Sequence, residues 1–311
     1  MNAYLVSHYG PDGLQHATLD QRPPGPEEIA IRLDAIAINP LDWKIRNGWL
    51  DEMIPLPLPA VIGSEGAGTV LSVGADVTGF AVGDRIAGFI DSGAFAETAV
   101  TRAARLLPVP AGLSTEQAAA LPTAAETATR IYALLHPEPA STVVVNGAAG
   151  SVGSMITQLL VRDGHAVIGT ASADNHDYVR GLGATPIGYG PALVDDLRRL
   201  APAGIHAGYD TTGHGFIGRV TDLLPARRIV TIVDFAAAAQ GAIVAGGDPT
   251  QLTITAAVRE VFDSAARGEL RVSIAASYDF DALPDALALS ERGHLRGRVI
   301  VRGKGRESAG V

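Results

Sequence analysis

The chain has 311 residues, more than one hydrophobic core usually holds, and its 47% hydrophobic and 18% charged residues exclude a disordered protein and favour two packed domains. The net charge is -9 and no stretch is strongly basic, which argues against a nucleic-acid partner. Cysteine is absent, so disulfides, thiol nucleophiles and cysteine-ligated zinc sites are excluded.

The beginning of the sequence has no features of a targeting segment. It runs directly into the polar stretch Ser7-His8-Tyr9-Gly10, with neither the basic flank nor the apolar core of a signal peptide. No segment is apolar over the length needed to cross a bilayer. We therefore expect a cytoplasmic protein without a membrane partner.

The first hundred residues are predicted to be rich in β-strands. Glycine, proline and aspartate separate short apolar or alternating runs at 29–37, 68–73, 85–89 and 95–100. This pattern favours a compact, partly open barrel over alternating strands and helices.

A helical segment is predicted to follow. Ser114 and Gln117 have the spacing of a capping box, in which the first residue caps the helix and the second reaches back to it. Pro122 interrupts the alanine-rich helix, which we expect to resume through Leu135.

From residue 142 the sequence alternates between strand and helix patterns. Predicted strands lie at 142–146, 166–170, 205–210 and 228–233, and predicted helices at 152–163 and 175–181. This alternation is typical of a doubly wound parallel sheet. After a last helix from about residue 256, β-type runs return at 271–277 and 298–301.

The first of these strands leads into a glycine-rich turn. Gly147 permits a tight turn, Gly150 allows the backbone to approach a diphosphate, and Gly153 allows the following helix to pack against the strand. The helix N-terminus then offers free amides and a positive dipole end to the phosphates. Glycine-rich turns between a strand and a helix also occur for steric reasons alone. The second predicted strand, at 166–170, follows at the spacing of a Rossmann unit and favours a dinucleotide site.

The residue about 20 positions beyond such a turn distinguishes the two nicotinamide coenzymes. An acidic residue there binds the ribose 2′-hydroxyl of NADH, whereas this strand ends in Thr170-Ala171-Ser172. Small hydroxyls favour the 2′-phosphate of NADPH, and Asp174, two residues further on, opposes it. We expect NADPH as the cofactor.

Several motifs in the same order resemble the medium-chain dehydrogenase/reductase superfamily, in its zinc-independent quinone oxidoreductase branch. Besides the glycine-rich turn, they are INPLDWK at 38–44, GSEGAGTV at 63–70, VGDRIAG at 82–88, GAFAE at 93–97, AAALPT at 118–123, RGLGA at 180–184 and GHLRGRV at 293–299.

The resemblance implies an α/β fold, a Rossmann doubly wound parallel sheet inserted in a GroES-like β-rich catalytic domain. The catalytic domain would comprise residues 1–118 plus 256–311 and the Rossmann domain residues 119–255. It also implies a cofactor in the cleft between the two domains and a homodimer.

The same resemblance implies that no metal is bound. Zinc-containing relatives have a cysteine where this chain has Asn39 and a histidine where it has Ser64. Amide and hydroxyl oxygens beside the single carboxylate of Asp42 suit zinc poorly. Alcohol oxidation is then disfavoured, whereas reduction of a quinone or an activated C=C bond remains feasible.

The candidate catalytic residues come from the first motif. Asn39 is expected to bind the substrate carbonyl or the nicotinamide ribose, or else to cap the turn into Pro40. Asp42 would anchor hydrogen bonds near the nicotinamide, or cap a helix beginning at Trp43. Lys44 would stabilise the developing enolate or relay a proton, or be a solvated lysine.

The candidate cofactor-binding residues come from the glycine-rich turn, from strand ends and from matches to family motifs. They are Thr127, Gly147, Ala149, Gly150, Ser151, Val152, Thr170, Ser172, Tyr189, Thr211, Val233, His294 and Arg296. The resemblance places Thr127 at the nicotinamide and Tyr189 at the adenosine phosphate, although Glu126 departs from the apolar residue expected beside Thr127.

The sequence therefore predicts an NADPH-dependent reductase of a small quinone or enone substrate, working by direct hydride transfer without a metal. Two alternatives remain open. One is an enoyl-thioester reductase of a biosynthetic pathway, and the other is a catalytically silent NADPH-binding sensor or structural protein. The acceptor itself depends on loops, including residues 45–60, whose conformation the sequence does not determine.

Overall fold

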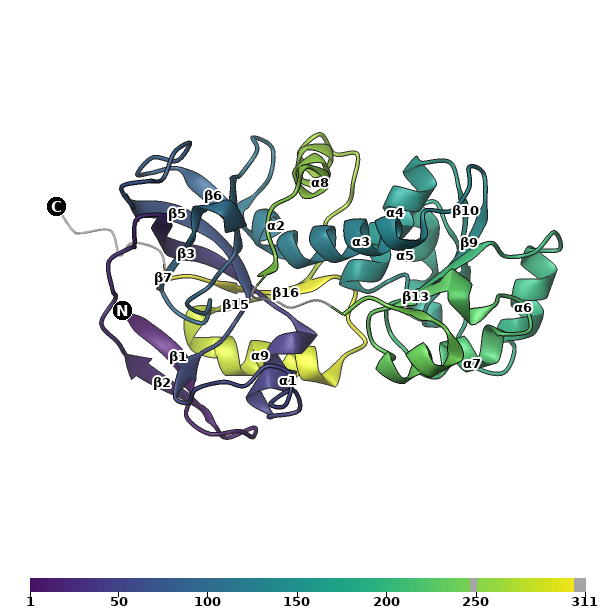
Figure 1. Cartoon of the computed structure of the whole chain (residues 1–311), viewed down its shortest axis with the longest axis horizontal. Helices are drawn as coiled ribbons and strands as arrows, with labels where there is room; N and C mark the ends of the chain where they lie inside the picture. Colours follow the sequence, from purple (N-terminus) through teal and green to yellow (C-terminus); the bar gives the residue numbers. More distant parts are fainter. Residues whose placement is uncertain (247–250, 305–311) are drawn as a thin grey trace. The chain divides into compact units, whose positions relative to one another are not determined.

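The computed structural model describes residues 1–246 and 251–304. The chain forms two compact units, which are described separately (Figure 1). Unit 1 comprises Met1–Thr123 with Pro249–Val311, and unit 2 comprises Ala124–Asp248. The domain junctions expected after residues 118 and 255 lie near these divisions.

Unit 1 is rich in β-structure. A seven-stranded sheet has the order β15-β16-β3-β5-β6-β8, with β7 paired to β3 on the edge opposite β5, and a small sheet has the order β2-β1-β4. The strands are β1 (Asn2–Val6), β2 (Leu14–Thr18), β3 (Glu28–Ile38), β4 (Ala60–Val61), β5 (Glu65–Val73), β6 (Arg85–Phe89), β7 (Thr98–Arg102), β8 (Leu106–Pro108), β15 (Ile274–Asp279) and β16 (Arg298–Arg302). The predicted β-rich GroES-like part of the fold is confirmed.

The core of unit 1 forms around the long strand β3. Ile29, Ile31 and Leu33 alternate along the strand and are almost completely buried. The strand predicted at 95–100 is wrong in its position, since β7 begins at Thr98. Phe95 is instead a buried core residue whose backbone N–H donates to the Ile62 carbonyl, outside the strand ladder.

Among the described residues, four α-helices lie entirely within unit 1. They are α1 (Pro40–Arg46), α2 (Thr115–Ala120), α8 (Ala256–Ala266) and α9 (Leu283–Arg292). The predicted capping box is confirmed at α2, because Gln117 N–H donates to Ser114 Oγ at 3.1 Å and Ser114 N–H donates to Gln117 Oε1 at 3.0 Å.

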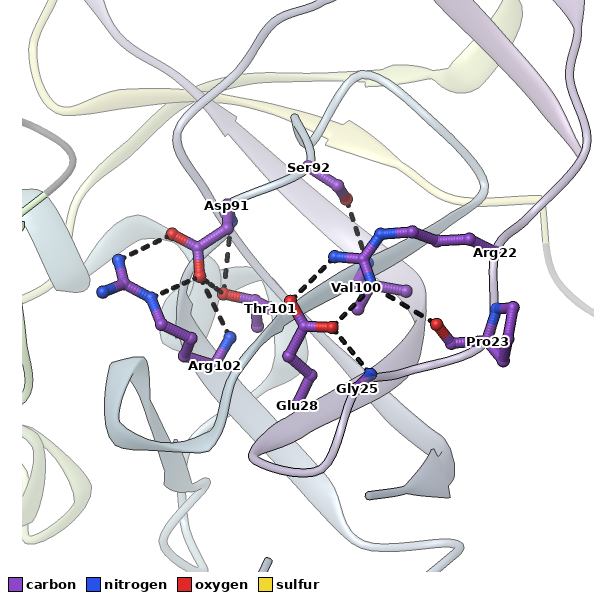
Figure 2. Close-up of polar contacts among 9 residues, drawn as sticks. All are labelled: Arg22, Pro23, Gly25, Glu28, Asp91, Ser92, Val100, Thr101 and Arg102. Carbon is purple, nitrogen blue, oxygen red and sulfur yellow. Dashed lines mark hydrogen bonds and ion pairs between the residues drawn. The ribbon is translucent and has the colours of Figure 1, made fainter. Parts of the chain in front are cut away.

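Two arginine–carboxylate pairs brace one edge of unit 1 (Figure 2). Arg22 donates to both oxygens of Glu28 at 2.5 and 2.7 Å, and this bond, followed by one from Gly25 N–H, lowers the pKa of Glu28 to about 2. Arg102 contacts both oxygens of Asp91 at 3.0 and 2.9 Å. Because Glu28 and Arg102 are register partners of β3 and β7, the pairs tie two loops to adjacent strands.

Unit 2 is built on a six-stranded parallel sheet with the order β11-β10-β9-β12-β13-β14. Its strands are β9 (Thr142–Asn146), β10 (Ala166–Thr170), β11 (Thr185–Ile187), β12 (Ala207–Asp210), β13 (Ile229–Thr231) and β14 (Ile243–Val244). In chain order this is the 3-2-1-4-5-6 arrangement of a Rossmann fold, so the predicted fold class is confirmed. The strand order reverses between β9 and β12.

The helices of unit 2 are α4 (Ser151–Arg162), α5 (His176–Gly181), α6 (Leu193–Leu200) and α7 (Phe216–Val220). Helix α3 (Pro122–Leu135) begins at the end of the first segment of unit 1 and continues into unit 2. Val144 of β9 packs in one apolar cluster with Leu197 of α6 and Ile217 of α7.

Two strands of unit 2 are shorter than predicted. Strand β13 ends at Thr231 rather than at residue 233, because the backbone N–H groups of Val233 and Asp234 donate to Thr231 Oγ1 instead of to a neighbouring strand. Strand β12 starts at Ala207 rather than at residue 205. In the part of the chain that the structure describes, no helix has the length and apolar character of a membrane span.

Candidate functional site

The glycine-rich turn lies between β9 and α4 of unit 2. Gly147 has φ +87°, a conformation that L-residues rarely adopt, which explains the glycine at this position. Gly150 is the N-cap of α4 and provides no side chain to cap the helix. Since Gly150, Ser151 and Val152 are all partly exposed, the free amides of the first helical turn are accessible to an anion.

Two further glycine contacts explain the spacing of the turn. A methyl group at position 153 would lie 2.0 Å from the Gly147 carbonyl oxygen, so only glycine allows the helix to pack this closely. A methyl group at position 150 would meet only the Gly147 oxygen, at 3.4 Å. Gly153 therefore has a packing role, whereas Gly150 leaves space beside the helix N-terminus.

Buried polar side chains end four adjacent strands at the carboxyl edge of the same sheet. They are Asn146 of β9, Thr170 of β10, Asp210 of β12 and Thr231 of β13, and each is at most 2% exposed. Of these, only Thr170 was a predicted site residue. A polar residue that closes an apolar strand was the available signal for the other three.

Other predicted cofactor residues gather at this edge. Thr211 Oγ1 donates to the Asn146 carbonyl at 2.8 Å, and Tyr189, whose ring is 47% exposed, donates to the Thr170 carbonyl at 3.4 Å. Ser172 lies two residues after the end of β10 and accepts a bond from Asn175 at 2.9 Å. The structure thus brings together Gly147, Ala149, Gly150, Ser151, Val152, Thr170, Ser172, Tyr189, Thr211 and Val233 around the strand ends.

Thr127 lies on α3, and its environment is partly ionic. Its hydroxyl donates to Glu126 Oε2 at 3.3 Å, and Glu126 in turn pairs with Arg130 at 2.7 Å. Arg130 also donates to the Ala245 carbonyl at 3.0 Å, next to the end of β14. The glutamate that departed from the expected apolar residue is therefore accommodated by an arginine one turn along the helix.

His294 and Arg296 belong to unit 1, in the loop between α9 and β16. Both side chains are exposed, and His294 has φ +58°. They are not part of the group that unit 2 assembles, and their contact with a cofactor stays a prediction.

Asn39 is the N-cap of α1 in unit 1 and is almost completely buried. Its side-chain nitrogen donates to Glu65 Oε1 at 2.8 Å and to Ser64 Oγ at 3.2 Å, while its oxygen accepts a bond from Arg298. Both donors and the acceptor therefore have partners within the protein. Direct contact of Asn39 with a substrate stays a prediction and would require one of these bonds to be exchanged.

Asp42 is fully buried at the third position of α1. It accepts a bond from Asn39 N–H at 2.7 Å. The helix beginning at Trp43 with Asp42 as its cap is wrong: Pro40 starts the helix one residue after Asn39, because proline is preorganised for the first helical position. Burial raises the pKa of Asp42 to about 7, and the Asn39 bond opposes this shift.

Glu65 and Arg298 complete this cluster and were not predicted as site residues. The Glu65 carboxylate accepts a bond from Thr123 N–H at 2.6 Å, in the first turn of α3, and lies 3.5 Å from Arg298 Nη2. The side chains of Glu65 and Arg298 are at most 5% exposed. A charged residue within an apolar strand was the available signal in each case.

Lys44 is half-buried on α1, with its Nζ 5.5 Å from the centre of the Trp43 ring. Burial lowers the pKa of Lys44. Within residues 1–246 and 251–304, no group of three or more histidines and acidic residues could hold a metal ion.

Two family matches cover most of the chain. The alcohol dehydrogenase GroES-like domain matches residues 25–111, and the zinc-binding dehydrogenase family matches residues 182–301. The first range contains Asn39, Asp42 and Glu65, and the second contains Arg298 and the strands β11 to β14.

Individual relatives agree with these matches. A chloroplastic quinone-oxidoreductase homolog from Spinacia oleracea is 32% identical over 198 residues, which cover 60% of this chain and only 60% of that protein. Quinone-oxidoreductase QR1 from Triphysaria versicolor, also chloroplastic, is 30% identical over 241 residues, covering 71% of this chain and 73% of that protein.

The solved structure of Escherichia coli quinone oxidoreductase complexed with NADPH has a TM-score of 0.85 to this chain. It is 26% identical, and the superposition covers 97% of this chain and 100% of that one. With its GroES-like unit, its Rossmann strand order and its open glycine-rich turn, this chain belongs to the medium-chain dehydrogenase/reductase superfamily, in the quinone oxidoreductase branch.

Proposed function

We propose that this protein is an NADPH-dependent reductase of quinones or α,β-unsaturated carbonyl compounds that transfers hydride directly, without a metal. The observation that carries the proposal is the uncapped, accessible N-terminus of α4 behind the glycine-rich turn, at the strand-order reversal of a Rossmann sheet. The likeness to a quinone oxidoreductase solved with NADPH supports the same cofactor.

In this proposal unit 2 binds the cofactor. Gly147, Ala149 and Gly150 surround the diphosphate, and the amides of Ser151 and Val152 in the first turn of α4 donate to it. Thr170, Ser172 and Tyr189 serve the adenosine side, Thr211, Val233 and Thr127 serve the nicotinamide side, and His294 and Arg296 contribute from unit 1.

Unit 1 provides the groups that act on the acceptor. The reduced nicotinamide supplies the hydride, and one further proton completes the reduction of the acceptor to a quinol or a saturated carbonyl. Lys44 provides positive charge for the developing oxyanion and passes on a proton that solvent replaces. Asn39 orients the acceptor, and Asp42 holds Asn39 through its backbone N–H.

A single-turnover experiment tests the reaction. Stopped-flow oxidation of bound NADPH is followed with a quinone, an enone and an enoyl thioester. Oxidation by the quinone or the enone supports the proposal. Oxidation by the thioester alone identifies an enoyl-thioester reductase, and cofactor binding without any oxidation identifies a silent sensor.

Lys44 is tested by replacement with alanine. Lys44→Ala is expected to lower the hydride-transfer rate by about tenfold or more, with unchanged cofactor affinity, because an oxyanion-stabilising charge is removed. Lys304→Ala is the matched control, since Lys304 is a surface lysine paired with Asp281 at 2.9 Å. Equal rates in wild type and Lys44→Ala would exclude this role.

Cofactor preference and assembly belong to the same proposal. Asp174 is exposed just beyond β10 and carries the charge that opposes a 2′-phosphate, so Asp174→Asn is expected to strengthen NADPH binding several-fold and leave NADH binding unchanged. Calorimetric titration with both coenzymes measures this change in affinity.

We also propose that the protein is a homodimer located in the cytoplasm. Sedimentation of the purified protein tests whether it is a dimer.

A further inference from the structure

Asp210 is a buried carboxylate without a cationic partner. It ends β12 with 0% of its surface exposed, and within the described residues it makes no ion pair. Its Oδ1 accepts bonds from Asn146 Nδ2 at 2.8 Å, Gly213 N–H at 2.8 Å and Thr212 N–H at 3.3 Å. Its Oδ2 accepts a bond from the Thr231 hydroxyl at 2.9 Å.

One hydrogen-bond chain leads from Asp210 to the glycine-rich turn. Asn146 donates to Asp210, and its own oxygen accepts the hydroxyl of Thr170 at 2.6 Å. The Thr170 oxygen in turn accepts Gly147 N–H at 2.9 Å. Each group in this chain therefore has a defined donor or acceptor role, ending at the backbone of the turn.

A second chain leads to the loop after β13. The Thr231 hydroxyl donates to Asp210, and its oxygen accepts Asp234 N–H at 3.0 Å and Val233 N–H at 3.2 Å. Three of the groups around Asp210 are N–H donors, and the Thr231 oxygen already accepts two N–H bonds, so its hydroxyl hydrogen points to Asp210. Asp210 accepts in all four bonds and thereby sets the direction of both chains.

Burial of a carboxylate without a cation is costly, and the four hydrogen bonds that Asp210 accepts offset this cost. What the carboxylate provides is a common acceptor for the ends of β9, β12 and β13, and through Thr170 for β10. These four strands flank the reversal of strand order, where open α/β sheets bind their ligands.

We infer that Asp210 is a positioning residue that holds the glycine-rich turn and the loops after β12 and β13 in the conformation that receives a dinucleotide. The inference rests on the proposed function. Asp210 touches no ligand itself, since it is fully buried, and acts through Gly147, Gly213 and Val233.

The principal test is Asp210→Asn. The oxygen of the new side-chain amide still accepts the bonds from Asn146 and Gly213. Its NH2 group replaces the oxygen that faces Thr231, so the Thr231 hydroxyl loses its acceptor. We expect at least tenfold weaker binding of NADPH and NADH by calorimetry. Binding of adenosine 2′-phosphate, which lacks the diphosphate, should change less than twofold.

A second pair of variants tests the chain to the turn. Thr170→Val removes the acceptor of Gly147 N–H and should weaken dinucleotide binding at least tenfold, whereas Thr170→Ser keeps the hydroxyl and should restore it to within threefold. Thr157→Val is the matched control: Thr157 is a fully buried threonine of α4 whose hydroxyl has no hydrogen-bond partner among the residues that the structure describes. This variant should bind like wild type.

The outcomes separate the two hypotheses. If wild type binds neither NADPH nor NADH, the proposed function fails. If wild type binds and Asp210→Asn binds equally well, or loses adenosine 2′-phosphate to the same extent, the positioning role is overturned.

Amide hydrogen exchange of the cofactor-free wild type tests the positioning role even if a variant does not fold. The network predicts slow exchange of the amides of Gly147, Thr212, Gly213, Val233 and Asp234, each of which has a buried acceptor. Exchange of these amides at the rate of an open loop would overturn the positioning role.

Discussion

Asp42 is the residue whose chemistry burial alters most visibly. Its carboxyl has a pKa of about 7 in the folded protein, because desolvation favours the protonated form, against 3.8 for an exposed aspartate. Between these values the folded state holds a proton that the unfolded state has released. This group therefore stabilises the fold at low pH, and the stabilisation is lost as the pH rises through about 7.

Asp42→Asn is expected to remove this pH dependence. At about 1.4 kcal/mol per unit of pKa difference, the contribution lost by wild type amounts to a few kcal/mol at most. Urea unfolding of both proteins at intervals from pH 4.5 to 8 measures it, with the variant gaining stability relative to wild type as the pH rises. Parallel stability curves would show that Asp42 is ionised throughout.

The contacts within the polar cluster around Asp42 could not be predicted from the sequence. Asn39 was identified from its motif, but its bond to Arg298 joins residues 259 positions apart. No local pattern reports such a contact. Glu65 and Arg298 were seen only as parts of family motifs, and their pairing required the folded sheet, in which β16 and β5 flank β3.

At the scale of elements, the junction of β9 and α4 depends on one close approach. Gly153→Ala would place a methyl group 2.0 Å from the Gly147 oxygen, so the helix must shift. We expect a loss of about 1–3 kcal/mol of unfolding free energy, as for other overpacked sites, together with weaker dinucleotide binding.

Gly218→Ala is the control for this substitution. Gly218 lies in α7, and a methyl group there meets nothing within 4 Å. Helix propensity alone predicts a neutral or stabilising effect of up to about 1 kcal/mol. Thermal unfolding and calorimetry on both variants provide the comparison, and equal behaviour would contradict the packing role of Gly153.

The start of β3 depends on the Glu28–Arg22 pair. The pKa of Glu28 is about 2 in the folded protein and 4.5 for an exposed glutamate, so the pair stabilises the fold above about pH 4.5 and loses this effect as the pH falls toward 2. Because the pair is partly exposed to solvent, we expect Glu28→Gln to cost only about 1 kcal/mol at neutral pH.

The same measurement at acidic pH tests the cause. The stability difference between wild type and Glu28→Gln should narrow from pH 5 to pH 3, because the Glu28 carboxylate of the unfolded chain becomes protonated while that of the folded protein stays ionised. Glu27→Gln, at the exposed neighbouring position, should match wild type at both values. A difference as large at pH 3 as at pH 5 would assign the effect to packing rather than to the ion pair.

Element types followed well from local pattern, and element ends did not. The strand at 142–146 and the capping box at Ser114 were both recognised, since each depends on neighbours in sequence. The end of strand β13 was predicted two residues too late, because Val233 continues an apolar run. Its N–H turns instead to Thr231 Oγ1, whose orientation depends on Asp210 of another strand.

At the scale of the whole molecule, the proposal predicts coupling between cofactor binding and stability. A ligand that binds only the folded state stabilises it, by about 2.7 kcal/mol at a hundred times its Kd. We expect NADPH to raise the midpoint of thermal unfolding more than NADH does, measured by calorimetry at equal concentrations. No shift with either coenzyme would contradict the dinucleotide site.

The sequence by itself determined the class of fold, the glycine-rich turn and the exclusion of cysteine chemistry. Alternating hydrophobicity, turn residues and glycine spacing act over a few neighbouring residues, so they can be recognised without a structure. Only the tertiary structure decided that Asn39 is engaged by Glu65 and Arg298, and that Asp210 organises four strand ends. Hydrogen-bond partners and desolvation depend on residues far apart in the chain, which come together only when the sheets form.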